Sequence, residues 1–232
     1  LYHSPKVEAA YQRWAAAAER LPQVRSLPDP RVNFGFFLDE VETRTGAQQA
    51  RVGVSQSFPW PGLLSDREDA AAMAARAAWR QFEAARLEVT KRVVESLHEL
   101  AYLDAAIRIT GENLELLSSF EEIVRARYRV GSGPELIRVQ VELGQLEDRL
   151  AQLRAMRPTY VADLNAALNR PTDAPVAEFA ELPGRVASID GPALAKIARR
   201  SNPVLLALDE RIEEQRINSE VARKQGLPDF TV

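Results

Sequence analysis

The chain has 232 residues and a formal net charge of −3, and it contains no cysteine. This charge gives no basic footprint for nucleic acid, and the missing thiols exclude disulfides and thiolate metal ligands. No apolar run reaches the roughly 18 residues that a transmembrane helix requires. The length allows one or two domains, and a composition rich in Ala, Leu, Arg and Glu with little Gly indicates long helices.

Two segments about 200 residues apart read as the same element written twice. The first runs from His3-Ser4-Pro5 to Leu27-Pro28-Asp29, and the second from Ser201-Asn202-Pro203 to Leu227-Pro228-Asp229. Each predicts a helix followed by a strand. Residues 1–30 therefore form the helix of a first repeat, and residues 201–232 are expected to begin a second one. We interpret the chain as a fragment from which a leader and an anchor were removed.

Residues 31–61 are predicted to form a β-hairpin. Strands are expected from Arg31 to Leu38 and from Arg51 to Pro59, with a polar stretch, Glu42 to Ala50, between them. The apolar positions that alternate with small or polar residues are Val32, Phe34, Phe36, Leu38, Val52, Val54, Phe58 and Trp60. This alternation fits an ordinary half-buried strand pair, and it also fits strands of a membrane barrel whose apolar face meets lipid.

Residues 62–176 predict a long helical hairpin. After the rigid turn Phe58-Pro59-Trp60-Pro61-Gly62, a helix from Leu63 to Val130 would rise about 100 Å. It carries two heptad series, one of Val93, Leu100, Ile107 and Leu114 and one of Ile109, Leu116, Ile123 and Val130. The return helix has a coiled-coil seam of Leu136, Val139, Leu143, Leu146, Leu150 and Leu153. Two series on one helix predict two packing partners.

The turn between these helices is Gly131-Ser132-Gly133-Pro134, a sequence suited to a tight antiparallel reversal. Three arginines, Arg125, Arg127 and Arg129, precede it. They either cap the negative end of the helix dipole or mark a docking or gating surface at an exposed tip. Residues 177–200 are expected to form a turn-rich connector that ends in a short helix, Ala193 to Arg200.

The sequence offers little chemistry. Two histidines, His3 and His98, and two methionines, Met73 and Met156, stand isolated. Catalytic constellations and phosphate-binding loops do not emerge, and acidic residues alternate with arginine on the helices as solvated faces. We therefore expect a protein that is not an enzyme and has no cofactor or metal site.

Three motifs resemble the TolC-type outer-membrane efflux proteins. The segments are Arg127-Tyr128-Arg129-Val130-Gly131, then Ile137-Arg138-Val139-Gln140-Val141-Glu142-Leu143, and Leu164-Asn165-Ala166-Ala167-Leu168-Asn169-Arg170-Pro171. The junction Ser55-Gln56-Ser57-Phe58-Pro59-Trp60-Pro61-Gly62 is similar to that of the CzcC-like branch, which serves heavy-metal and other resistance-nodulation-division pumps. The resemblance spans nearly the whole chain.

The resemblance implies a mainly α fold that is half of a TolC-like protomer, with a coiled-coil hairpin and one β-hairpin. It implies a homotrimer in the outer membrane of a Gram-negative-type cell, with barrel strands in lipid and helices forming a periplasmic tunnel. Partners would be a periplasmic adaptor and an inner-membrane pump, and the cargo metal ions or small toxic compounds. The tip residues expected to meet the adaptor are Arg127, Tyr128, Arg129, Gly131, Ser132, Gly133 and Glu135.

One other function also fits this sequence. A soluble periplasmic adaptor or scaffold could also combine a coiled coil with a small strand-containing domain. The two functions differ over residues 31–61, whose apolar side chains would face lipid in a channel and a protein core in an adaptor.

Overall fold

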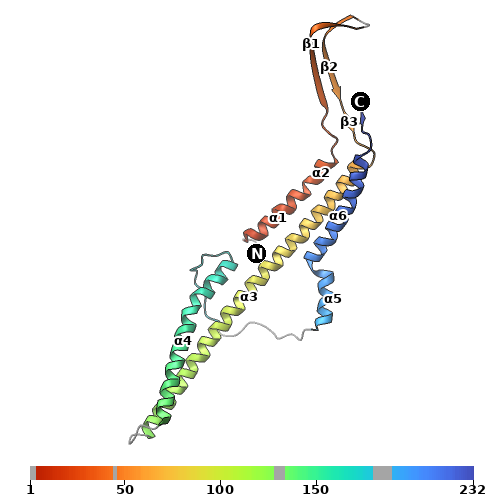
Figure 1. Cartoon of the computed structure of the whole chain (residues 1–232). Helices are drawn as coiled ribbons and strands as arrows, with labels where there is room; N and C mark the ends of the chain where they lie inside the picture. Colours follow the sequence, from red (N-terminus) through yellow and green to blue (C-terminus); the bar gives the residue numbers. More distant parts are fainter. Residues whose placement is uncertain (1–3, 44–45, 128–133, 180–189) are drawn as a thin grey trace. The chain divides into compact units, whose positions relative to one another are not determined.

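The computed structural model describes residues 4–43, 46–127, 134–179 and 190–232. Its architecture is mainly α, with short antiparallel sheets (Figure 1). The elements in chain order are α1 (Pro5–Ala18), α2 (Arg20–Arg25), β1 (Arg31–Thr43), β2 (Gly46–Ser55), β3 (Ser57–Phe58), α3 (Leu63–Arg127), α4 (Pro134–Ala167), α5 (Gly191–Ser201), α6 (Pro203–Gln225) and β4 (Phe230–Thr231). None of the described helices has an apolar stretch long enough to cross a membrane.

The elements divide into two compact units. One, here called the coiled-coil unit, comprises Leu1–Glu8 and Arg86–Asp190. The other, here called the strand unit, comprises Ala9–Ala85 and Gly191–Val232. Helix α3 gives its first part to the strand unit and the remainder to the coiled-coil unit.

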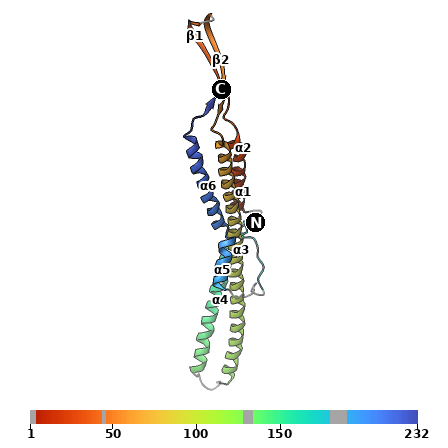
Figure 2. The ribbon, with the colours of Figure 1, turned by 90° about the vertical axis from the view of Figure 1, so that its right-hand side faces the viewer.

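In the coiled-coil unit, α4 runs antiparallel to the second part of α3 (Figures 1 and 2). Side chains along one stripe of each helix close the seam between them. The buried apolar residues of this seam are Leu100, Leu103 and Val124 on α3 and Leu150, Leu153 and Leu164 on α4. The predicted coiled-coil hairpin is therefore confirmed, and the heptad series through Leu100 is the covered one.

The second heptad series of α3 is not covered within its unit. Ile109, Leu116 and Ile123 are all exposed, while Val130 lies outside the described residues. Of the two packing partners predicted for this helix, α4 is therefore the first, and the partner of the second stripe stays a prediction because no described residue of the unit covers it.

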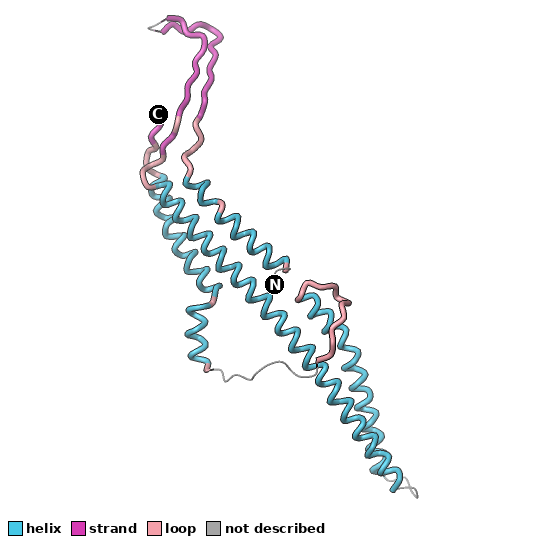
Figure 3. Tube along the Cα trace, turned by 180° about the vertical axis from the view of Figure 1, so that it is seen from behind, coloured by secondary structure: helices cyan, strands magenta, loops and turns pink. Residues whose placement is uncertain are grey.

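Beyond α4 the chain turns back on itself. The backbone reverses at Asn169, whose φ of +55° lies in the left-handed region that asparagine tolerates. The buried Asn165 side chain then donates from Nδ2 to the carbonyl oxygens of Thr172 at 3.2 Å and Ala174 at 2.8 Å. These bonds hold the described residues 168–179, here called the connector although the prediction began it at residue 177, beside the last turns of α4 (Figure 3).

In the strand unit, α1, the first part of α3 and α6 lie side by side (Figures 1 and 2). Their contact surfaces are built from small residues, which allow helix axes to approach closely. The buried alanines are Ala10, Ala70, Ala75, Ala77, Ala85 and Ala207. An aromatic cluster adds bulk between α1 and α3, where the Trp14 and Trp79 ring centroids are 4.9 Å apart and the rings meet edge to face.

The two repeated segments fold differently. The second forms one continuous helix, α6, whose first turn is capped by Asn202 Oδ1 accepting from the Val204 N–H at 2.9 Å. In the first, α1 ends at Ala18 and α2 begins at Arg20. The helix predicted for this segment is therefore interrupted at one residue, Glu19, which keeps helical backbone angles (φ −68°, ψ −10°) and donates its N–H to the Ala15 carbonyl at 3.0 Å. The interruption lies where Pro22 has no N–H to donate to the Ala18 carbonyl and its ring crowds that carbonyl.

The strands also depart from the predicted bounds. β1 extends to Thr43 and β2 begins at Gly46, so most of the stretch predicted as a polar connection is paired strand. The ladder needs only backbone groups, and polar side chains do not end it. The register of the pair shifts between Phe36 and Val41. The second predicted strand, Arg51 to Pro59, is divided into β2, which ends at Ser55, and β3, which begins at Ser57. Helix α5 likewise starts two residues before the predicted Ala193.

Candidate functional site

The β1–β2 hairpin gathers its apolar side chains on one face. The register pairs Val32 with Val54, Phe34 with Val52, and Phe36 with Ala50. Opposed residues of an antiparallel pair share a face, and successive residues alternate between faces. The other face therefore carries the intervening pairs, which are Arg31 with Ser55, Asn33 with Gly53 and Gly35 with Arg51. The hairpin has one apolar and one polar face over its first six pairs.

The apolar face of this hairpin is strongly exposed. Val32, Phe34, Phe36, Val52 and Val54 each leave between 66% and 71% of their surface accessible. Exposure of that kind is unusual for clustered apolar side chains in water, and it is typical of surfaces that contact lipid or another chain. Leu38 belongs to β1, but its side chain lies outside the described set.

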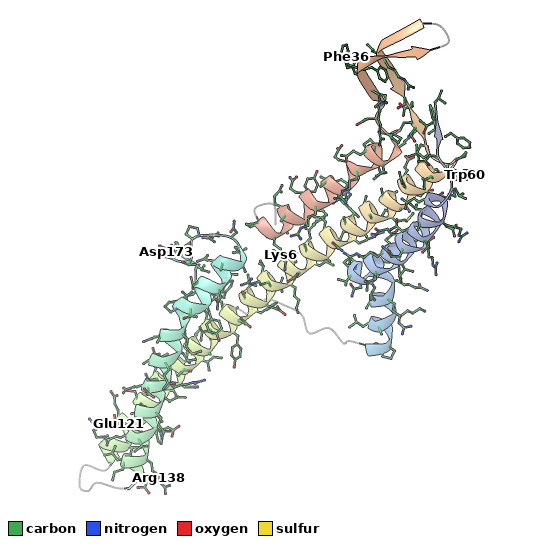
Figure 4. All side chains as sticks on the ribbon, turned by 45° about the horizontal axis from the view of Figure 1, so that its top comes forward. Lys6, Phe36, Trp60, Glu121, Arg138 and Asp173 are labelled. Atoms are coloured by element: carbon green, nitrogen blue, oxygen red, sulfur yellow. The ribbon has the colours of Figure 1, made fainter. Side chains whose placement is uncertain are left out.

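Of two further predicted residues, Phe58 ends β3, and Trp60 lies at the base of the hairpin (Figure 4). β3 pairs with the C-terminal strand β4, which sets Phe58 opposite Phe230. The Trp60 ring stacks on Phe230 with centroids 6.1 Å apart and planes 21° apart. Backbone bonds between Gln56 and Val232, at 2.8 and 3.1 Å, extend this pairing. Phe58 and Trp60 were predicted as residues of this site, whereas Phe230 was expected only to begin the strand after the second Leu-Pro-Asp, which is where β4 starts.

The turn into α3 is held by a charge contact. Gly62 has a φ of +83°, a conformation that favours glycine, and a Cβ placed there would lie 3.0 Å from Lys224 Nζ. Lys224 Nζ also lies 2.6 Å from Oδ2 of Asp66 in the first turn of α3. That oxygen has no partner of hydrogen-bonding geometry among the described residues, so the contact is best regarded as an ion pair. The pair joins the end of α6 to the start of α3.

Of the predicted tip residues, most lie outside the described residues: Tyr128, Arg129, Gly131, Ser132 and Gly133. Arg127 is the last residue of α3, and Glu135 is exposed in the first turn of α4. The adaptor contact predicted for this group stays a prediction. Nearby, Glu121 Oε1 accepts from Arg125 at 2.6 Å and from Gln140 of α4 at 3.2 Å, which places a polar contact across the two helices.

A polar cluster that the sequence analysis missed lies deeper in the coiled-coil unit. Arg157 of α4 donates from Nε to Asp104 Oδ1 at 2.7 Å and from Nη2 to Oδ2 at 3.3 Å. Asp104 also accepts from the Phe179 N–H at 3.0 Å, and Arg157 Nη2 donates to the Val176 carbonyl at 3.3 Å. The Asp104 side chain is only 3% exposed. We call these four residues the seam cluster.

One signal could have revealed this cluster. The apolar seam of α4 steps by threes and fours through Leu146, Leu150 and Leu153, and the next step falls on Arg157. A charged residue at a seam position requires a partner. The hydrogen bond from Arg157 to Asp104 raises the pKa of the guanidinium, and this effect outweighs the lowering by burial.

The described residues hold no group of three His, Cys, Asp or Glu side chains placed to bind a metal ion. Met73 and His98 lie on α3, Met156 lies on α4, and His3 is outside the described residues. Three other features of the described residues stand out: the exposed apolar face of the hairpin, the exposed second stripe of α3, and the buried seam cluster.

No family model and no curated protein matches the sequence. Solved structures do match. They include the Campylobacter jejuni CmeC outer membrane channel (19% identity, TM-score 0.70, 99% of this chain), the outer-membrane channel OprN (14%, 0.76, 97%) and the outer membrane protein VceC from Vibrio cholerae (20%, 0.66, 100%). At these identities the likeness shows the fold alone, which is that of about half a protomer of such channels.

The chain spans between 52% and 58% of the length of these three proteins. The match covers both units, so the order of the strand pair, the long helix and the return helix is that of the outer-membrane channels. The resemblance drawn from the sequence motifs is confirmed at the level of the fold. The matches do not single out the CzcC-like branch, which stays a prediction.

Proposed function

We propose that this chain, which has the fold of TolC-like outer-membrane efflux channels, is part of a channel that conducts substrates passively from the periplasm to the exterior. The observation that carries the proposal is the exposed apolar face of the β1–β2 hairpin. The paired apolar side chains at Val32, Phe34 and Phe36 would contact lipid, and the opposite face, with Asn33 and Arg51, would line water.

Physical chemistry supports this assignment of faces. Apolar surface in water is unfavourable by about 25 cal/mol per Å². A two-stranded hairpin is also marginally stable by itself, since a sheet needs further strands or a packed layer. A closed barrel in lipid provides both, because neighbouring strands pair every edge and the bilayer receives the apolar face. Phe58, Trp60 and Phe230 would lie near the interface, where aromatic side chains are enriched in such barrels.

The helices would form a periplasmic tunnel in a homotrimer. The uncovered stripe of Ile109, Leu116 and Ile123 requires a further helix, and helices of the same assembly would supply it. The tip from Arg127 to Glu135 would meet the hairpin of a periplasmic adaptor that joins the channel to an inner-membrane pump of the resistance-nodulation-division type. Exported metal ions or small toxic compounds would pass without tight binding, and the assembly would carry out no catalysis.

The test is conductance of the protein expressed from the complete reading frame that contains these residues. Stable single-channel currents in a planar bilayer, from a trimeric species, are the expected result. A monodisperse product that stays in water and gives no current would instead favour the soluble adaptor or scaffold.

A second measurement addresses the hairpin directly. The 232 residues contain no cysteine, so an introduced cysteine is the only one among them. A fluorophore on Phe34→Cys should be quenched by nitroxide-labelled lipids, whereas the same fluorophore on the matched neighbour Asn33→Cys should be quenched by aqueous iodide. Equal responses at the two positions would contradict the assignment of faces.

A further inference from the structure

The seam cluster is the place where three segments of the coiled-coil unit meet. Asp104 comes from α3, Arg157 from α4, and Val176 and Phe179 from the connector that follows α4. We propose that Asp104 and Arg157 are positioning residues, which fix the antiparallel register of α3 and α4 and dock the connector only in that register. The proposal concerns the fold of this chain and does not depend on the channel function.

The leucine seam alone discriminates poorly between registers. Its apolar residues recur every seven positions, so sliding α4 by one heptad, about 10.5 Å at 1.5 Å per residue, again sets apolar residues against apolar residues. In the slipped arrangement, the midpoint of the turn between the helices would move by about half a heptad along the sequence. Something other than the repeating leucines has to distinguish these arrangements.

The polar contacts supply that distinction. Residue 104 contacts 157 and residue 121 contacts 140, so 17 residues forward on α3 correspond to 17 residues backward on α4. A one-heptad slip would set Asp104 against Leu150 or Leu164, which are both buried apolar residues. The slip would also separate the Asp104 carboxylate from the Arg157 guanidinium.

Such a slip is penalised strongly because of burial. An ionised carboxylate that is 3% exposed loses hydration that only its hydrogen bonds replace. A buried ion pair adds little net stability compared with apolar residues, but a broken one leaves an uncompensated charge. The cluster therefore acts on the choice between registers more than on the stability of the native one. A polar residue at a coiled-coil seam is known to fix register in this way.

The connector is fastened by the same atoms. Oδ2 of Asp104 accepts from both Arg157 and the Phe179 N–H, and Nη2 of Arg157 donates to both Asp104 and the Val176 carbonyl. The docking site on the helices is incomplete unless both side chains are opposed. Connector docking thus reports on helix register, and a change in the pairing of α3 and α4 would release residues 176–179.

The test uses disulfide cross-linking. By the register of the two polar contacts, Leu117 and Leu143 lie in the same layer of the seam. A chain with Leu117→Cys and Leu143→Cys should therefore cross-link within one molecule. Two further chains carry Leu117→Cys with either Leu136→Cys or Leu150→Cys. A cross-link in one of these chains reports a slip of one heptad in the corresponding direction. When Asp104 and Arg157 are unchanged, only the pair at positions 117 and 143 should cross-link to a large extent.

Two variants separate register from docking. In Asp104→Leu with Arg157→Leu the seam stays apolar and helical, but slipped cross-links should rise by about tenfold or more, equivalent to removing a ~1.4 kcal/mol penalty. In Asp104→Arg with Arg157→Asp the reversed pair should restore the native cross-link. The charge-reversed variant has an arginine at residue 104, which cannot accept from the Phe179 N–H, and an aspartate at residue 157, which cannot donate to the Val176 carbonyl. The connector should therefore stay undocked in this variant.

Amide hydrogen exchange measures whether the connector is docked on the helices. Protection of the Phe179 N–H should fall in both variants, while the Ala174 N–H, which donates to the Pro171 carbonyl at 3.0 Å, serves as the internal control. If the double-leucine variant cross-links only in the native register, the turn sets the register and the proposal is overturned. Undiminished protection of Phe179 in the charge-reversed variant would overturn the docking half. If the double-leucine variant is not helical, the charge-reversed variant decides the test. Failure of the charge-reversed variant to form the native cross-link would also contradict the proposal.

Discussion

Helix α3 carries two heptad stripes of similar composition that end in opposite environments. Leu100, in the stripe that faces α4, is completely buried, whereas Leu116, in the neighbouring stripe, is 71% exposed. Both are leucines at seam positions of one continuous helix. A heptad pattern therefore predicts an interface but does not say whether the partner belongs to the same chain.

The β1–β2 hairpin extends this lesson to strands. Its alternation correctly predicts two faces, but the apolar face finds no cover among the described residues of its unit. A covered stripe stabilises the chain itself, while an uncovered stripe or face becomes favourable only in an assembly or in lipid. The following predictions separate these two kinds of surface, beginning with the largest effect.

The largest effect is expected where the covered seam contains a charge. Arg157→Ala should lower the free energy of unfolding by about 3 to 5 kcal/mol, because the Asp104 carboxylate stays buried without its partner. Denaturant unfolding followed by circular dichroism measures it. Arg154→Ala, an exposed arginine one turn earlier on α4, is the matched control and should stay within about 0.5 kcal/mol. An equal loss in the two variants would contradict the role of the ion pair.

The two leucines test the comparison itself. Leu100→Ala should destabilise the chain by about 2 to 5 kcal/mol through lost burial and the cavity left behind. Leu116→Ala should change the stability of the isolated chain by no more than about 0.5 kcal/mol. The same unfolding experiment at low protein concentration gives both values. A large loss for Leu116→Ala would mean that its stripe is covered within a single chain.

The uncovered stripe should matter in the assembly. Leu116→Ala should weaken self-association of the protein from the complete reading frame by about 1.5 to 3 kcal/mol, the value of burying a leucine side chain. Sedimentation across a concentration series measures this, with Ser118→Ala on the same helix as control. An unchanged association constant would show that another surface joins the protomers.

The smallest effect concerns an exposed ion pair of the coiled-coil unit. Lys6 donates a hydrogen bond to Glu88, and this bond, with the positive charge, lowers the pKa of the Glu88 carboxyl below its ordinary 4.5. A lowered folded-state pKa adds stability above the ordinary value, and this contribution is lost as the pH falls through the folded pKa. Because both side chains are solvated, the effect on stability is small.

Lys6→Gln should therefore move the pKa of Glu88 upward toward 4.5. Titration of the carboxyl carbon by NMR measures the shift, and added salt should reduce the difference between the variant and the native chain. A pKa of Glu88 that is the same with and without Lys6 would contradict the ion pair.

Elements whose causes are local could be predicted from the sequence. Heptad spacing gave α3 and α4 and both stripes of α3, and alternation gave the two faces of the hairpin. The repeated Pro and Leu-Pro-Asp signals located α1 and α6, and the motif order matched the fold of the outer-membrane channels. Pro22 was also a local signal, and giving it its full weight would have predicted the break between α1 and α2.

Features that join distant residues depend on the packing of whole elements and could not be predicted from local patterns. Asp104 and Arg157 are separated by 53 positions, and their pairing depends on the register of two helices rather than on any spacing within one. The stacking of Trp60 on Phe230 and the choice of which stripe α4 covers are of the same kind. Periodicity fixes which face of an element is apolar because it follows from local geometry. The partner of that face is fixed by packing and burial, which no local pattern contains.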